Sequence, residues 1–362
     1  MNRYHRGFIA SLMLLPLAAF GLPGESIALD PNTGNYRITY FGINESTGKR
    51  DVLRSAIFEP ATKIEPTIRT SLTIAASGIV AYRYRIYNAA TSRQPIVMVL
   101  FDPVAGLITT DSQSQLAATM ASNSVAQNWG VASYPINSPS GWIGRVTASR
   151  KGKLRVGWDS GDGGVQPGLQ LNGYGIFSTA LPGIGIANIQ GDSSLLEMAD
   201  EGPIGEIGDQ LDNLVKRDFV SRPAVVPTIA VPAPFDATVL LERIRAEMQT
   251  WPGKQLLDPA FAAQLDRYIV SAAEAFRLND PKAAKEHIQT LRKILDKEHR
   301  GLENDDADDE DTEEHKQAAR RSIDRLAARV LDFDLRYVLK RIEGGHEKGD
   351  GKKTLQAPFD KH

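Results

Sequence analysis

The absence of two residue types from most of this chain limits the chemistry that it can perform. It has no cysteine, and no histidine lies between Arg6 and Glu286. That stretch therefore has no thiol nucleophile and no imidazole to act as a general base or a metal ligand. Triad-type and histidine–zinc chemistry are excluded there. Carboxylates, hydroxyl groups and tryptophans remain.

A pair of carboxylates is the one enzymatic arrangement that needs neither missing residue. Glycosidases use two Asp or Glu side chains about 5–9.5 Å apart. The β-rich part of the chain offers the following candidates, most of them in expected turns: Glu45, Asp51, Glu59, Glu65, Asp102, Asp111, Asp159 and Asp162. Sequence spacing does not pair any two of them, so we predict no catalytic residue and keep a carboxylate-dependent glycan-active enzyme as an alternative.

Three tryptophans and two aspartates are the predicted ligand-binding residues: Trp129, Trp142, Trp158, Asp159 and Asp162. The rings lie at expected strand ends or loops, where a flat ring can stack on a sugar or an apolar partner. Ordinary core packing is the alternative. The two aspartates resemble ligands of a hard cation, but calcium needs six or more oxygens and the local sequence supplies at most four. We therefore predict a plain turn and no metal.

Residues 303–314 are almost wholly acidic. An EF-hand loop starting at Asp306 would need glycine at its sixth position and glutamate at its twelfth. This chain has Asp311 and Gln317 there, so we predict a solvated loop between helices. We also expect the histidines of this region to lie on the surface: His287, His299 and His315.

Residues 1–28 are typical of a cleavable export signal. A basic start precedes an apolar run over residues 7–22, which is shorter than the roughly 20 residues that span a membrane. Small residues at Ser26 and Ala28 suit a signal peptidase, so cleavage is expected after Ala28. No later stretch is apolar enough to cross a membrane. We therefore expect a secreted or periplasmic protein.

Residues 29–200 have the period of β-strands. Tyr36, Ile38 and Tyr40 alternate with polar residues, as on a half-buried strand. Further strands are expected over residues 80–88, 96–101, 142–149, 153–158, 169–177 and 183–190. Short strands separated by Gly and Pro turns indicate an antiparallel β-sandwich, Ig-like or jelly-roll-like.

The composition changes after residue 200. Prolines such as Pro223 and Pro227 punctuate residues 201–234, and they exclude a helix or an interior strand. We predict a Pro-rich linker or a strap lying on the sandwich.

Residues 235–342 have the period of helices and predict a four-helix bundle. Asp236, Asp258 and Asp280 are expected N-caps of the first three helices. The acidic loop precedes the fourth, which is expected over residues 313–342. A disordered tail is predicted over residues 343–362. The fold class is thus multidomain, with a β-sandwich followed by helices.

Two resemblances accompany these patterns. The β half resembles uncharacterised β-sandwich modules of exported bacterial proteins in residues 82–88, 139–142, 156–158, 166–169 and 181–183. The helical half is similar to the FIMAH domain, a helical module at the C-terminal ends of exported bacterial proteins, in residues 265–276, 279–281, 283–284, 288–291 and 322–339. The FIMAH resemblance implies extracellular attachment or recognition and supplies no catalytic residues. The acidic insertion departs from its compact pattern.

The functional expectation combines these observations. The formal net charge of -2 and a pI near 6.3 give no overall attraction to nucleic acid. We predict a non-catalytic exported binding, adhesion or scaffold protein without a cofactor. Its partner would be an envelope or extracellular protein or polysaccharide. A purely structural envelope protein is a further alternative, and the oligomeric state is left open.

Overall fold

The computed structural model describes residues 24–75, 78–107, 135–148, 153–196, 198, 200, 202–299 and 322–346. The chain forms two compact units, and each unit uses two separate stretches of sequence. Unit 1 takes the residues up to Thr62 together with Asp192–Asp218, and unit 2 takes the others. Trp129, His315, the acidic loop 303–314 and most of the predicted leader and tail lie outside the described residues.

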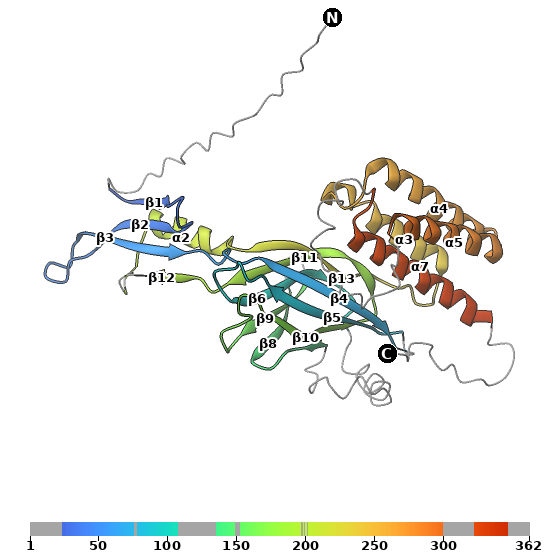
Figure 1. The fold of residues 1–362 in the computed structure, drawn as a ribbon, viewed down its shortest axis with the longest axis horizontal. Coiled ribbons are helices and arrows are strands. Elements are labelled where there is room, and N and C mark those ends of the chain that lie inside the picture. The colour runs from blue at the N-terminus through green and yellow to red at the C-terminus, as the bar shows by residue number, and fades with distance from the viewer. Residues whose placement is uncertain are drawn as a thin grey trace, which may run out of the picture. The chain divides into compact units, whose positions relative to one another are not determined.

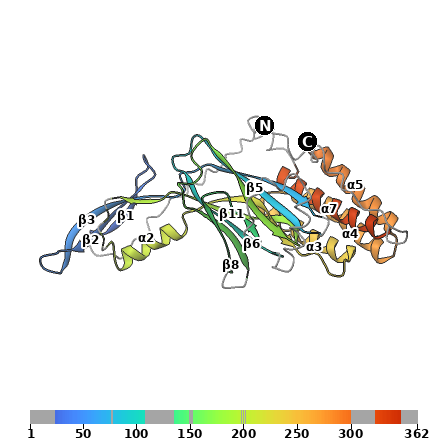
Figure 2. The ribbon, with the colours of Figure 1, turned by 90° about the horizontal axis from the view of Figure 1, so that it is seen from below.

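Unit 1 is an antiparallel sheet with one helix on it. The strand order is β1-β2-β3-β12, so the short β12 returns to pair with β3 from far along the chain. Figure 2 shows α2 lying beside this sheet. The elements are β1 (Ser26–Leu29), β2 (Tyr36–Ile43), β3 (Arg50–Glu59), β12 (Ser194–Leu196) and α2 (Glu206–Lys216).

Only one face of the unit 1 sheet is buried. Ile38 and Tyr40 of β2 and Phe58 of β3 pack against Ile207 and Leu211 of α2. The alternate residues of the same strands are exposed or half-buried. Helix α2 and the sheet thus form a two-layer unit. Among the described residues, no further layer covers the other face of the sheet.

Unit 2 contains two antiparallel sheets that pack face to face. One has the order β4-β5-β10-β7 and the other β13-β11-β6-β9-β8. The strands are β4 (Pro66–Ile74), β5 (Val80–Asn88), β6 (Ile96–Val104), β7 (Ile136–Asn137), β8 (Trp142–Ala148), β9 (Leu154–Ser160), β10 (Gln170–Ser178), β11 (Leu181–Gly191) and β13 (Val220–Ile229). The antiparallel sandwich expected from the sequence is present, with β6 in the middle of its sheet.

The boundaries of this sandwich differ from residues 29–200. Strands β2 and β3 belong to unit 1, because their apolar face packs on α2 and their sheet partners are β1 and β12. A period of two predicts a strand but does not say which sheet the strand joins.

Residues 201–234 also differ from the predicted linker or strap. They contain helix α2 and strand β13, which pairs with β11 over nearly its whole length. Pro223 and Pro227 are tolerated because β13 is an edge strand, where one side of the backbone needs no ladder partner.

The first three C-terminal helices begin where the sequence predicts. Asp236, Asp258 and Asp280 each accept backbone N–H bonds at the start of a helix. The fourth helix, expected over residues 313–342, is wrong at its start: α7 begins at Arg325, because residues 322–324 are not helical and Ile323 forms a β-bridge with Leu257. Helix α7 runs four residues into the predicted tail. The helices are α3 (Ala237–Met248), the 3-10 turn η2 (Pro252–Lys254), α4 (Pro259–Arg277), α5 (Pro281–Glu298) and α7 (Arg325–His346).

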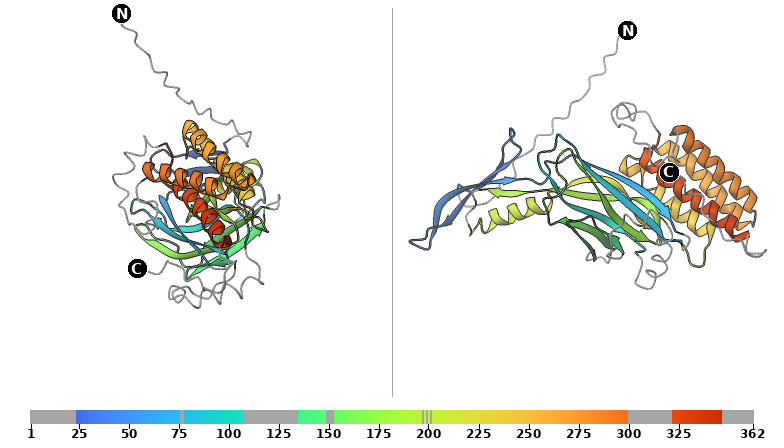
Figure 3. Two further views of the ribbon diagram at one scale, coloured as in Figure 1. Left: turned by 90° about the vertical axis from the view of Figure 1, so that its right-hand side faces the viewer. Right: turned by 60° about the horizontal axis from the view of Figure 1, so that its bottom comes forward.

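These helices pack on the sandwich within unit 2. Helices α3 and α7 contact strands β11 and β13, and α4 packs on α3 while α5 packs on α4 (Figures 1 and 3). None of the helices within the described ranges combines the length and apolar character that a bilayer span requires.

Side chains from the helices form hydrogen bonds with the backbone of β11 where β11 has no β6 beside it. Strand β6 pairs with β11 only from Ile186 onward. Before Ile186, the Ile184 N–H donates to Glu247 at 3.1 Å, and Lys254 donates to the Ile184 carbonyl at 2.5 Å. Polar helix side chains thus replace the missing strand and leave no bare sheet edge there.

Candidate functional site

Trp158, one of the predicted ligand-binding residues, lies in the sandwich core. Its side chain is 0% exposed, and its indole Nε1–H donates to the Asn137 carbonyl at 2.8 Å. The ring packs edge-on against Phe101 at 5.8 Å and Tyr174 at 5.5 Å between ring centroids. A ligand cannot stack on this ring without unpacking both sheets.

Trp142 belongs to the same cluster of rings. It is buried and meets Tyr174 edge-on at 5.2 Å. Tyr84 adds a stacked contact with Phe101 at 4.4 Å across the two sheets. The tryptophans at the expected strand ends therefore hold the sheets together, and the prediction that Trp142 and Trp158 bind a ligand is corrected to core packing.

Asp159 and Asp162 each have contacts within the sandwich. Asp159 pairs with Arg145 of the neighbouring strand at 3.7 Å. Asp162 lies in a turn whose N–H groups at Asp162 and Gly164 both donate to Ser160 Oγ. No group of three or more potential metal-ligating side chains occurs within the described ranges.

Two of the candidate carboxylates, Asp102 and Asp159, lie on the neighbouring strands β6 and β9. Asp102 binds Arg155 at 2.7 Å, and Asp159 lies four residues farther along β9. At about 3.3 Å per residue the backbone positions of Asp102 and Asp159 lie roughly 13 Å apart along the strands, which is a wider spacing than that of the two glycosidase carboxylates. Each one also has an arginine partner, so the pair has neither the spacing nor a free proton acceptor.

His299 was expected on the surface, but it is buried. Its ring Nε2 lies 2.7 Å from the Ile323 carbonyl. A carbonyl only accepts, so Nε2 carries the proton. This contact ties the end of α5 to the segment that leads into α7, which is a structural role.

A buried aspartate lies where the helices meet the sandwich. Asp334 of α7 is almost completely buried, and its Oδ1 has no hydrogen-bond partner among the described residues. Burial raises the pKa of Asp334 well above its ordinary value, and the nearby Glu247 of α3 raises it further. Burial also raises the pKa of Tyr82 in β5, and the Asp334 carboxyl raises it further.

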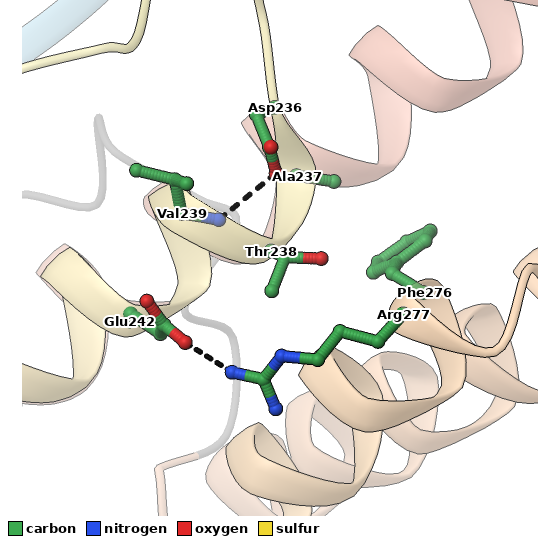
Figure 4. Close-up of a pocket in the computed structure, with 7 residues that line it drawn as sticks. All are labelled: Asp236, Ala237, Thr238, Val239, Glu242, Phe276 and Arg277. Atoms are coloured by element: carbon green, nitrogen blue, oxygen red, sulfur yellow. Dashed lines mark hydrogen bonds and ion pairs between the residues drawn. The ribbon is translucent and has the colours of Figure 1, made fainter.

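The surface pocket in Figure 4 lies between the start of α3 and the end of α4. It has a volume of about 570 Å³. Asp236 accepts the Val239 N–H, and Arg277 pairs with Glu242 and with Glu274. Its charged groups already have internal partners, so it offers little to recognise a polar ligand.

The open face of the unit 1 sheet is the most distinctive exposed surface. The register places Phe41 beside Leu53 and Ile57 beside Leu196 on the face opposite α2. Leu53 is 56% exposed, Leu196 48% and Ile43 41%. We call these residues the open face: Phe41, Ile43, Leu53, Ile57 and Leu196.

Aliphatic side chains on an uncovered sheet face are costly to leave in water. Burying each would gain roughly 1.5–3 kcal/mol. Exposed apolar patches mark interaction sites in soluble proteins; on this face Thr39 and Ser55 lie between the Phe41–Leu53 pair and the Ile57–Leu196 pair. The predicted site residues do not include any of these five.

The sequence carries a signal for the open face. Strand β3 has apolar residues on both faces: Ala56 and Phe58 point toward α2, and Leu53 and Ile57 point away from it. A strand with one solvated face should alternate, whereas apolar residues on both faces predict burial on both. The alternation of Tyr36, Ile38 and Tyr40 described only the inner face.

Comparison with known proteins adds little. No family model matches the chain, and no curated protein matches it. One solved structure that is similar to this chain is described as an uncharacterized protein from Nocardia farcinica with an immunoglobulin-like fold. It is 14% identical, with a TM-score of 0.24, over 44% of this chain and 98% of that one.

Replacing Trp158 separates core packing from ligand binding. We expect Trp158→Ala to lower the free energy of unfolding by about 3–5 kcal/mol, because it empties the centre of the ring cluster. Ile143→Ala on the neighbouring strand is the control. Its side chain is 56% exposed, so the change should stay within about 0.5 kcal/mol. Chemical denaturation measures both. Wild-type stability in Trp158→Ala would contradict the core assignment.

Asp334→Asn should stabilise unit 2 at neutral pH. The folded-state pKa of Asp334 is raised, so its carboxyl holds the proton more tightly in the folded chain. Wild-type stability should therefore fall as pH rises from the ordinary aspartate pKa toward the folded-state value. The loss is about 1.4 kcal/mol per unit of elevation. The amide of the variant does not titrate and so does not lose stability over this range. The stabilisation by Asp334→Asn should therefore shrink as the pH falls toward 4.

Asp332, two residues away on the same helix, is the matched control. It is also buried, but Arg292 and Arg336 both pair with it, at 2.6 and 2.9 Å. Asp332→Asn should destabilise the fold, by less than the roughly 3–5 kcal/mol of a fully buried pair because the arginines are partly exposed. The same sign of change in both variants would contradict this account.

Proposed function

We propose that this chain is an exported, non-catalytic binding protein that docks a protein partner on the open face of unit 1. The observation that carries the proposal is the row of exposed aliphatic residues on a sheet whose other face is covered by α2. Apolar cores surrounded by polar residues are the usual anatomy of protein interfaces.

The chemistry of the face favours a protein over a polysaccharide. Sugar-binding surfaces rely on exposed aromatic rings and hydrogen-bonding groups. The exposed apolar side chains of this face, Leu53, Leu196 and Ile43, are aliphatic, and the ring of Phe41 is half-buried. Trp142 and Trp158, two of the tryptophans that would suit a glycan, are in the core of unit 2. This supports an apolar protein surface as the ligand.

Unit 2 serves as the scaffold in this proposal. We take its sheets as an Ig-like or jelly-roll-like sandwich, and α3, α4, α5 and α7 as a four-helix bundle of FIMAH type. Both modules belong to the repertoire of exported recognition proteins that the sequence resembles. The spacing of Asp102 and Asp159 argues against the glycan-active alternative.

A site-specific photo-crosslinker at Leu196 tests the proposal in the native cells. We expect one discrete adduct with an envelope protein. Leu53→Asp in the same chain should reduce that adduct at least tenfold, because it places a charge in the centre of the open face, and tenfold corresponds to about 1.4 kcal/mol of binding free energy.

Leu278→Asp is the matched control. Leu278 is 72% exposed but lies at the end of α4 in unit 2, so the adduct should be unchanged. The absence of an adduct, or an adduct that Leu53→Asp leaves intact, would contradict the proposal. An adduct between two copies of the chain would instead indicate the purely structural role.

A further inference from the structure

The residues just after the apolar leader are part of the folded unit 1. Strand β1 pairs with β2 from Ser26 opposite Thr39 to Leu29 opposite Tyr36. Ile27 packs against the unit 1 core. The polypeptide is therefore structured from Ser26 onward, two residues before the expected cleavage at Ala28.

Glu25 also has a defined structural position. Its side chain is only 3% exposed and pairs with Arg50 at 2.9 Å. The same carboxylate oxygen accepts the Phe41 N–H at 3.1 Å. Arg50 in turn donates to the carbonyls of Phe41 and Ile204. Within the described ranges, Glu25 is thus the carboxylate that pairs with Arg50, in a network that joins β2, β3 and the segment before α2.

Cleavage after Ala28 would break this arrangement. It removes Glu25 and three of the four residues of β1, and it leaves the half-buried Arg50 guanidinium without its carboxylate. Removing one partner from a buried pair is costly because the other charge stays desolvated. The structure therefore needs the mature chain to begin before Glu25.

We infer that signal peptidase cleaves between Gly21 and Leu22, so that the mature protein begins at Leu22. Ala19 and Gly21 supply small residues at the third and first positions before the cut. Residues 8–18 then form the apolar core of the leader, with a length inside the usual range of 7–15. Water adds across the Gly21–Leu22 peptide bond, giving a new carboxylate at Gly21 and a new amine at Leu22.

This inference rests on the proposed export, and one experiment separates the two. The full chain is expressed with its own leader and a C-terminal tag in a Gram-negative host, then analysed by intact mass and N-terminal sequencing. We expect a single species that begins at Leu22. A chain that begins at Leu29 would overturn the inference and leave export standing. An uncut chain that begins at Met1 would overturn both.

Two leader variants sharpen the result. Gly21→Leu should abolish the Leu22 start, because a bulky residue replaces the small one directly before the cut. Ala28→Leu should leave the Leu22 start unchanged, since Ala28 is exposed and no longer near the cut. Loss of processing in Ala28→Leu alone would overturn the inference.

Two recombinant forms test the structural reason directly. Amide hydrogen exchange is compared between chains that begin at Leu22 and at Leu29. We expect faster exchange in β2 and β3 of the shorter chain, and equal exchange in β10 and β11 of unit 2. Equal protection of β2 and β3 in both forms would show that the residues up to Ala28 are dispensable.

Discussion

Burial of apolar side chains between layers is the constraint on which this structure depends. The chain has no cysteine and therefore no disulfide to support a weak core. In unit 2, apolar side chains are buried between the two sheets, which share one core, and also between β11 and β13 and the helices that pack on them. In unit 1 the constraint is met on only one side, since α2 covers a single face of the sheet. That asymmetry is the physical basis of the proposed binding function.

The local elements could largely be predicted from the sequence. Asp258 and Asp280 cap helices where an aspartate followed by proline predicts a helix start. The strands around Tyr84 and Val99 follow the apolar pattern. Capping and periodicity are interactions between near neighbours in the chain, so the sequence reports them directly.

The assembly of those elements could not be predicted in the same way. Strand β12 pairs with β3 from about 135 residues away, and β13 pairs with β11 despite its prolines. Such pairings depend on long-range register, which local patterns do not encode. The same limit explains Trp158: an aromatic residue at a strand end suits a binding site or a core equally well, and only its contacts with Phe101 and Tyr174 decide.

The open face is the central claim, and protection of its side chains in the native envelope tests it most directly. Carbene footprinting would compare the purified protein with the protein in intact cells. The account predicts reduced labelling of Leu53, Leu196 and Ile43 in cells and unchanged labelling of Leu278. Equal labelling of the open face in both settings would contradict it.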